Sequence, residues 1–333
     1  MTQPDGFTGA AIQRAIDSLN GSGTVDIARG QYNLGDTGIV IPQGQHRVQL
    51  LCESGTVFWY TGSGVALQVG GDNGNTEGFR MSGAEIALYG NPHDEAICLR
   101  LVRSFWATLQ DIRLVSDGGA PNPRQYGLII GGGTTDEAGF SAYTTCINLA
   151  AIGSFRRCIA LGSGIPGGPS TGDRANSNII IGGSVYCGAQ NRADSIGIAI
   201  LHGDTNRIWG VDHDSLEVGT YVNGHANQVN ARYENIDKHA IHVGPSSMGS
   251  FVFGSAVPLG EWLDEGWETQ YILTSQGGVN KSMLTDMGSR YSTTLTPRWD
   301  TPAELHDGMC WYDGPSGSIK VRINGQTKTI KAE

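Results

Sequence analysis

Charged residues are scarce in this sequence, and basic ones are scarcer than acidic ones. Asp, Glu, Lys and Arg make up only 16% of its 333 residues, and 22 basic side chains stand against 32 acidic ones, for a formal net charge of −10. Phosphate backbones and anionic lipid surfaces repel a chain with this balance. We therefore expect neither nucleic acid nor a membrane surface among its partners.

Motifs that mark common metal, cofactor and membrane sites are also missing. No phosphate-binding Gly-Lys-Ser/Thr sequence occurs, no signal peptide opens the chain, and no apolar run approaches roughly 18 residues. The cysteines occur singly, without a Cys-x-x-Cys pair, at Cys52, Cys98, Cys146, Cys158, Cys187 and Cys310. We expect them to be buried thiols. We also expect no metal, no cofactor, no membrane insertion and synthesis in a cytoplasm.

Glycine, in contrast, is abundant, and it separates short apolar runs. The 50 glycines follow no collagen period, which is typical of a fold with many tight turns. The clearest order lies in residues 206–222, which align without a gap with the segment 21 residues further on. Asn206 falls on Asn227, and Ile208 falls on Val229. A period near 20 residues, built from apolar strands broken by Gly and Asn, predicts a solenoid.

These repeats predict an all-β chain that winds as a right-handed parallel β-helix. Residues 1–24 form a lead-in and a capping helix with Thr8 as its N-cap. Such a helix covers the first coil, whose core would otherwise meet water. Residues 25–245 form the coils, 246–300 a modified C-terminal continuation, and 301–333 a small C-terminal β domain that reads as a β-meander.

Two stretches resemble known proteins. The run Asp5–Ile16, followed by Gly23-Thr24-Val25 and Gly30-Gln31-Tyr32, is similar to the opening of pectate-lyase-superfamily β-helices, which is common in bacteriophage tailspikes and capsule depolymerases. Together with the repeats, this resemblance covers roughly residues 5–245. The tail, DGMCWYDGPSGSIKVRINGQTKTI over residues 307–330, resembles terminal segments of phage tail and fibre proteins.

The resemblance implies a virion protein that is assembled in the host cytoplasm and acts at the host cell surface. It also implies a homotrimer, with other virion proteins and host surface polysaccharide as partners. It leaves open whether the polysaccharide is hydrolysed, cleaved by a lyase reaction or only bound. The alternative is a non-catalytic structural, decoration or receptor-binding protein of the virion. The motif sets of pectate lyases and polygalacturonases are absent, which argues against pectin degradation.

Acidic residues are concentrated in two successive repeats. Asp212 and Asp214 lie in the first, and Glu234 lies in the second. Coils that stack about 4.8 Å apart would bring such carboxylates to about 5–10 Å, the separation that glycoside hydrolysis uses. We therefore predict that Asp212, Asp214 and Glu234 are catalytic. The gapless alignment places His213 beside Glu234 and Asp214 beside Asn235.

Side chains around these carboxylates are predicted to bind substrate, because aromatic rings stack on sugar faces and polar groups bind sugar hydroxyls. The predicted set is Trp209, His213, Glu217, Tyr233 and Asp237. A second interpretation stays open for each of them. Polar residues at coil corners often bind the turn backbone, and aromatic residues often pack in the core or against a neighbouring subunit.

Overall fold

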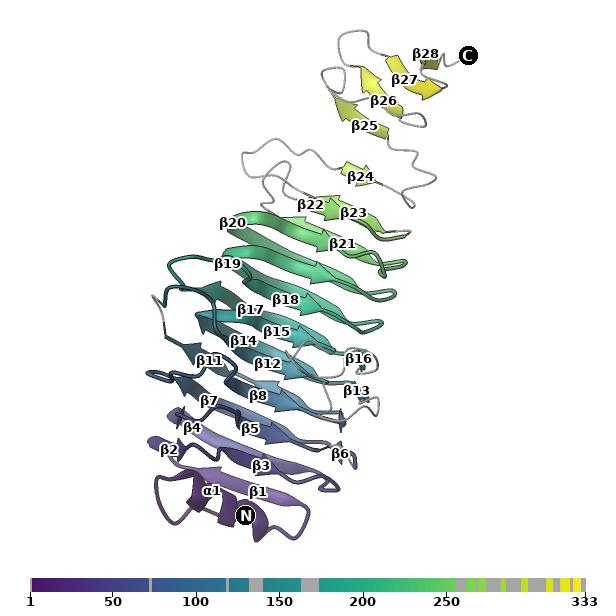
Figure 1. Cartoon of the computed structure of the whole chain (residues 1–333). Coiled ribbons are helices and arrows are strands. Elements are labelled where there is room, and N and C mark those ends of the chain that lie inside the picture. Colours follow the sequence, from purple (N-terminus) through teal and green to yellow (C-terminus); the bar gives the residue numbers. More distant parts are fainter. Residues whose placement is uncertain are drawn as a thin grey trace.

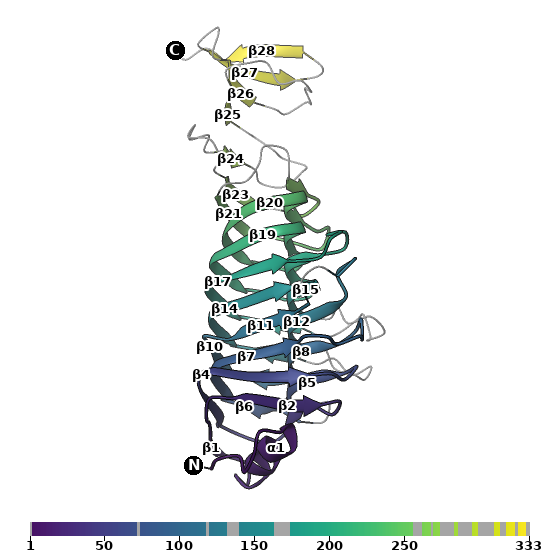
Figure 2. The ribbon, with the colours of Figure 1, turned by 90° about the vertical axis from the view of Figure 1, so that its left-hand side faces the viewer.

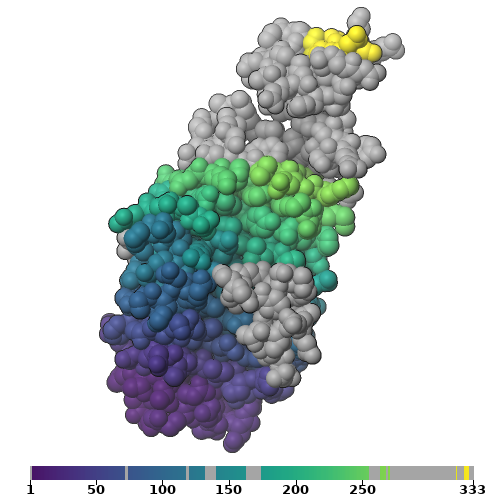
Figure 3. Space-filling model, viewed as in Figure 1, coloured from purple at the N-terminus to yellow at the C-terminus, as the bar shows by residue number. Residues whose placement is uncertain are grey.

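The structure, a computed structural model, describes residues 2–255 apart from 72–73, 118–119, 132–139 and 163–173, and beyond them 262–267, 269–273, 283–285, 295–298, 310–313, 318–323 and 326–330. The fold is the predicted right-handed parallel β-helix (Figure 1). The atoms coloured from purple to light green in Figure 3 form one elongated body that begins at the N-terminal cap. Within these residues, no helix has the length and apolar character needed to cross a membrane.

Each coil contributes to three faces, and strands on one face pair in parallel with those of adjacent coils (Figure 2). The first face holds β1 (Gly23–Ile27), β10 (Thr108–Gln110), β21 (Phe251–Ser255), β23 (Gln270–Leu273) and the first parts of the long strands β4 (Val48–Tyr60), β7 (Arg80–Leu88), β14 (Thr145–Gly153), β17 (Ile179–Cys187), β19 (Arg207–Val222) and β20 (Gln228–Val243). The second face holds β2 (Gln31–Gly35), β11 (Arg113–Ser116) and the following parts of those long strands.

The third face completes each coil. It holds β3 (Ile39–Ile41), β5 (Val65–Val69), β8 (Ile97–Leu101), β12 (Gln125–Ile130), β15 (Phe155–Leu161), β18 (Ile196–Ile200), β22 (Trp262–Asp264) and the last parts of β19 and β20. We number the corners by the face that precedes them, so the third corner leads from the third face back to the first. Four short strands line that third corner: β6 (Thr76–Glu77), β9 (Ser104–Phe105), β13 (Phe140–Ala142) and β16 (Arg174–Asn176).

The core consists of inward columns, because alternate residues of a strand point to the same side of the sheet. Ile180, Ile208 and Val229 are register partners on three successive coils, and none is more than 1% exposed. The predicted stacking of Ile208 on Val229 is therefore confirmed. Burial of such columns is the main stabilising contribution in a solenoid. Four of the cysteines are buried free thiols, as expected, namely Cys98, Cys146, Cys158 and Cys187.

The N-terminal helix is also confirmed. Helix α1 (Gly9–Asp17) begins after Thr8, whose side chain accepts a hydrogen bond from the Ala11 N–H at 3.2 Å. Its stripe of Ala11, Ile12, Ala15 and Ile16 is buried against the first coil, and α1 lies across the N-terminal end of the solenoid in Figure 1. A cap at this place removes the apolar end of the core from water.

The asparagines that open the repeats form a buried ladder just after the third corner. The Asn178 N–H donates to Asn206 Oδ1 at 3.0 Å, and the Asn206 N–H donates to Asn227 Oδ1 at 3.0 Å. The Asn227 side-chain amide donates in turn to the Gly203 carbonyl at 2.9 Å. A buried polar group is stabilising only when it is hydrogen-bonded, so this ladder fixes the register in which the coils stack.

Parallel pairing continues beyond residue 245. Strand β21 pairs with β20, and β23 pairs with β21, whereas β24 (Met283–Thr285) pairs antiparallel with β23. The predicted meander is present in the tail: β26 (Cys310–Asp313), β27 (Ser318–Ile323) and β28 (Gln326–Ile330) pair antiparallel in sequence. Strand β25 (Leu295–Arg298) extends this small sheet by pairing in parallel with β26.

Candidate functional site

The pairing of β19 with β20 corrects the gapless alignment of these two repeats. Trp209 pairs with Asn230, but the next pair is Val211 with Ala231, so Gly210 has no partner in β20. Gly210 adopts a positive φ of 67° and forms a bulge in β19 at the first corner. From Val211 to Leu216, the offset between partners is 20 residues rather than 21.

The altered register brings two of the predicted catalytic residues together. Asp214 is the direct Cα partner of Glu234, and Asp212 is the partner of Arg232. The predicted pairings of His213 with Glu234 and of Asp214 with Asn235 are therefore wrong. Asp212 is exposed, and Asp214 and Glu234 are partly exposed, on the outward side of the second face. We call these three residues the carboxylate patch.

Hydrogen-bond donors hold the carboxylates of this patch. Asp214 Oδ1 accepts from the Ser215 hydroxyl at 2.9 Å and from the Asn235 side-chain amide at 3.0 Å. Glu234 Oε2 accepts from the Arg232 guanidinium at 3.1 Å. Ser215 and Asn235 both have a positive φ, at 57° and 53°, so the second corner turns immediately beside the patch. The patch thus has ordered acceptor groups on a rigid sheet.

The structure has the side chains of His213 and Tyr233 in the core, which corrects the surface position predicted for them. They are only 1% and 0% exposed, because residue 213 lies between two outward residues and must point inward. Their rings lie 4.9 Å apart in the core. The Thr220 hydroxyl bridges them, at 3.1 Å from His213 Nε2 and 2.9 Å from the Tyr233 hydroxyl. Burial lowers the pKa of His213 to about 4, so the imidazole is neutral at pH 7.

The other three predicted substrate contacts lie on the surface, but not all in one place. Trp209 is 49% exposed on the first face, across the first corner from the patch. Glu217 lies at the second corner, where it accepts a hydrogen bond from the Asp194 N–H and lies 3.6 Å from Lys238 Nζ. Asp237, also at this corner, pairs with Arg192 Nη1 at 3.1 Å. Substrate binding by these residues stays a prediction.

Two residues that were not predicted from the sequence border the patch. Tyr186 on β17 is the partner of Asp214, so Tyr186, Asp214 and Glu234 form one outward row across three coils. Ser184 is the partner of Asp212 in the same way. Tyr186 is 37% exposed and offers a ring and a hydroxyl beside the carboxylates. The offset of 28 residues between Asn178 and Asn206, applied to Asp214, would have identified it.

A cleft of about 650 Å³ lies at the first corner and was also missed. It forms because β4 has four residues, Cys52–Gly55, where β7 has only Gly83. Glu85 Oε2 and Arg113 Nη1 form an ion pair of 3.3 Å in its lining, and Asp111 lines it as well. Burial raises the pKa of the Cys52 thiol to about 12, so this cysteine stays protonated and is no nucleophile at neutral pH.

Comparison with known proteins supports the fold. No protein-family model matches the chain, and no curated protein matches it. The ORF18 protein of Geobacillus virus E2 matches 97% of this chain and 83% of its own, with a TM-score of 0.52 and 12% identity. A tailspike of Acinetobacter baumannii bacteriophage Fri1, a capsular polysaccharide depolymerase, covers 96% of this chain and 75% of its own, with a TM-score of 0.46 and 10% identity. The tailspike of E. coli bacteriophage HK620 covers 82% and 60%, with a TM-score of 0.44 and 12% identity. At 12% identity, the likeness to the ORF18 protein shows a shared fold alone.

Proposed function

We propose that this protein is a virion protein of the tailspike type, which binds host surface polysaccharide and hydrolyses a glycosidic bond at the carboxylate patch. The pairing of Asp214 with Glu234 is the observation that supports hydrolysis. Adjacent strands lie about 4.8 Å apart, and retaining glycosidases hold their two carboxyl groups about 5–5.5 Å apart. Asp212 lies on the same outward side, two residues before Asp214.

The proposed reaction uses the two paired carboxyl groups in turn. The first group, an ionised carboxylate, attacks the anomeric carbon. The second group, a protonated carboxylic acid, gives its proton to the departing glycosidic oxygen. Water then attacks the anomeric carbon while the second group, now a carboxylate, accepts a proton from that water. The bond between the sugar and the first group breaks, and the sugar is released. Asp212, Ser184 and Tyr186 border the pair, and in this scheme they bind sugar hydroxyls. No metal enters this scheme.

The second candidate function is polysaccharide binding without catalysis, in a structural or receptor-binding protein of the virion. The donors on the patch favour it. Ser215, Asn235 and Arg232 donate to the oxygens of Asp214 and Glu234, which are therefore already engaged within the protein. Such fixed acceptors bind sugar hydroxyl groups well, and binding alone suffices for a receptor function.

We further propose a homotrimer, as the tailspike resemblance implies. The first face has an exposed apolar column of Ile147, Ile181 and Trp209, which are 37%, 46% and 49% exposed. An apolar column on a flat sheet is a surface that association of identical subunits would bury. Light scattering measures the oligomeric state, and Ile181→Lys is expected to shift it toward the monomer.

Incubation with polysaccharides of candidate hosts tests the proposed function. New reducing ends, without the ultraviolet absorbance of unsaturated uronate, are expected from the wild-type protein. Asp214→Asn and Glu234→Gln should each lower the rate by about 10²–10⁴-fold. Asp26→Asn, on the outward side of β1 at the far end of the solenoid, serves as the matched control and should leave the rate unchanged. Binding without new reducing ends would instead establish the non-catalytic function.

A further inference from the structure

The third corner turns through a residue with positive φ in successive coils. At most levels this residue is small, as expected for a conformation that disfavours large side chains. The small residues and their φ values are Gly78 at 67°, Ser177 at 55°, Thr205 at 56°, Ala226 at 51° and Gly249 at 62°. Larger residues hold the same position in three coils: Arg47, at 58°, and, on two adjacent coils, Trp106, at 56°, and Tyr143, at 61°.

Stability does not explain these two aromatic residues. Bulky side chains raise the energy of a left-handed backbone, and burial would be the usual compensation. Trp106 and Tyr143 are nevertheless 56% and 48% exposed, so about half of each side chain stays in contact with solvent. Residues that break a local rule without a structural gain are often retained for function.

The two rings form a flat platform. Trp106 and Tyr143 stack with centroids 5.7 Å apart and planes only 8° from parallel. Phe105 and Phe140 extend the aromatic cluster. Their ring centroids lie 5.5 Å apart, and Phe140 is 39% exposed. Such rings bind the apolar face of a sugar without any charge. The next positions along the corner, Gly78 and Ser177, carry no large side chain.

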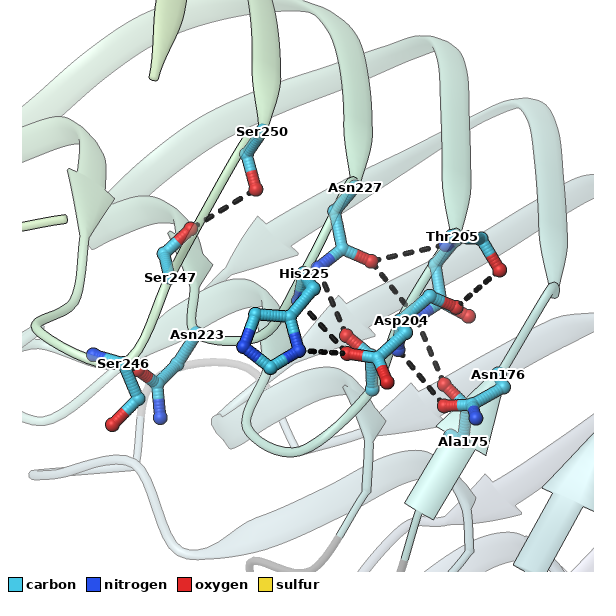
Figure 4. A network of polar contacts seen from close by, with 12 residues as sticks. Ala175, Asn176, Asp204, Thr205, Asn223, His225, Asn227, Ser246, Ser247 and Ser250 are labelled. Carbon is cyan, nitrogen blue, oxygen red and sulfur yellow. Dashed lines mark hydrogen bonds and ion pairs between the residues drawn. The ribbon is translucent and has the colours of Figure 1, made fainter. Parts of the chain in front are cut away.

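A polar pocket continues the same corner toward the C-terminus. Its volume is about 170 Å³, and its lining includes Arg174, His202, Asp204, Asn223 and His225. Asp204 Oδ1 lies 3.1 Å from His225 Nδ1, and the Asp204 N–H donates to Asn176 Oδ1 at 2.8 Å; both contacts are drawn in Figure 4. The buried asparagine ladder lies directly behind these groups and holds their spacing.

We infer that the third corner is an oligosaccharide-binding ridge, in which one sugar ring packs on the Trp106–Tyr143 stack and a later residue of the same glycan binds in the Asp204–His225 pocket. An aromatic platform beside a few ordered polar groups is the usual composition of a sugar site. This inference rests on the ligand class of the proposed function, but it places a second contact away from the carboxylate patch.

A second copy of the chain fits this corner less well. Stable protein interfaces bury about 800 Å² on each partner, which requires a broad surface. The platform lies on a turn between two faces, whereas the apolar column of the first face is flat and better suited to a subunit. The pocket adds paired polar groups, which a glycan with many hydroxyl groups can match.

Titration of polysaccharide binding tests the ridge. An array of bacterial capsular and O-antigen polysaccharides identifies a bound glycan, and calorimetry with its fragments gives the affinity. The double variant Trp106→Gly with Tyr143→Gly should bind roughly tenfold more weakly or worse. Its melting temperature should stay equal or rise, because glycine fits the left-handed backbone. Trp59→Ala, at a position 42% exposed on the second face, is the matched control and should bind normally.

The remaining outcomes separate this inference from the proposed function. Unchanged binding by the double variant, with loss of binding or cleavage in Asp214→Asn with Glu234→Gln, would overturn the ridge and leave the proposed function intact. Loss of the oligomer in the double variant, seen by light scattering, would make the corner a subunit contact and overturn the ridge as well. Absence of any bound polysaccharide on the array for the wild-type protein counts against both.

Discussion

The outer and inner sides of strands β19 and β20 differ completely, although their residues alternate along the chain. Asp212 and Asp214 reach solvent, whereas His213 between them is 1% exposed. In β20, Tyr233 is buried and its neighbour Glu234 is partly exposed. Because successive side chains of a strand point to opposite sides, a shift of one residue would exchange the two sets. The patch and the core behind it are therefore set by one register.

These two sides also contribute differently to stability. The Arg232–Glu234 pair has side chains that are 54% and 45% exposed, and such surface pairs contribute little. On the inner side, the Thr220 hydroxyl links His213 to Tyr233 in the buried core. A buried polar network costs free energy when one member is lost, because the others remain unpaired. Substitutions on the inner side should therefore affect unfolding, and those on the outer side should affect chemistry.

Acid should produce the largest effect on the inner side. The folded pKa of His213 is about 4, below its ordinary value of 6.5. Above pH 6.5 the imidazole is neutral in both states and contributes no pH dependence. As the pH falls from 6.5 to 4, the unfolded chain binds a proton that the folded chain does not, so stability falls, by about 3 kcal/mol in total.

Denaturation at a series of pH values measures this loss. His213→Gln removes the titrating group and should flatten the curve between pH 6.5 and 4, whereas Asp214→Asn on the outer side should leave that part of the slope in place. His239 is a second histidine whose pKa is lowered, by burial and by the neighbouring His242, and it is expected to account for residual slope in His213→Gln. An unchanged slope in His213→Gln would contradict the assignment.

A smaller effect should distinguish two neighbouring residues of β20. Tyr233→Phe removes the hydroxyl that contacts Thr220 but keeps the buried ring, so we expect a loss of about 1 kcal/mol in the free energy of unfolding. Glu234→Gln keeps the shape of an outward side chain and should change it by less than about 0.5 kcal/mol. Urea titration of both variants measures the contrast. Equal losses would show that the two positions do not differ as their exposure indicates.

Much of the fold could be predicted from the sequence. Thr8 and the apolar stripe after it indicate α1, and the match of Asn206 with Asn227 indicates the coil length. The candidate site was harder to predict, because two one-residue insertions in the paired strands cancel each other in the sequence alignment. Gly210 is an extra residue in β19, and β20 has its own extra residue between Ile236 and His239. The total offset returns to 21, so the alignment has no visible gap while its middle is displaced by one.

The third-corner platform could not be predicted in the same way. Trp106 and Tyr143 are 37 positions apart in the sequence, far from the period of 21 that the clear repeats show. They stack because the coil between them carries additional residues outside the regular strands. Only the register of β9 against β13, with Phe105 opposite Ala142, brings the two rings together. Because the coils differ in length, a search for one fixed sequence period cannot identify such contacts.

The bend at Gly210 offers the finest test of the register. A Cβ atom at this position would meet nothing within 4 Å, so a substitution there acts through the backbone and not through a clash. Gly210→Ala should cost about 1 kcal/mol, because its φ of 67° disfavours a residue with a side chain. Gly210→Asn should cost less, since asparagine tolerates the left-handed region. Thermal unfolding of the two variants measures the difference. If both variants unfold like the wild type, the left-handed backbone at Gly210 does not determine which side of the sheet Asp212 and Asp214 face. The pairing of Asp214 with Glu234 would then need another cause.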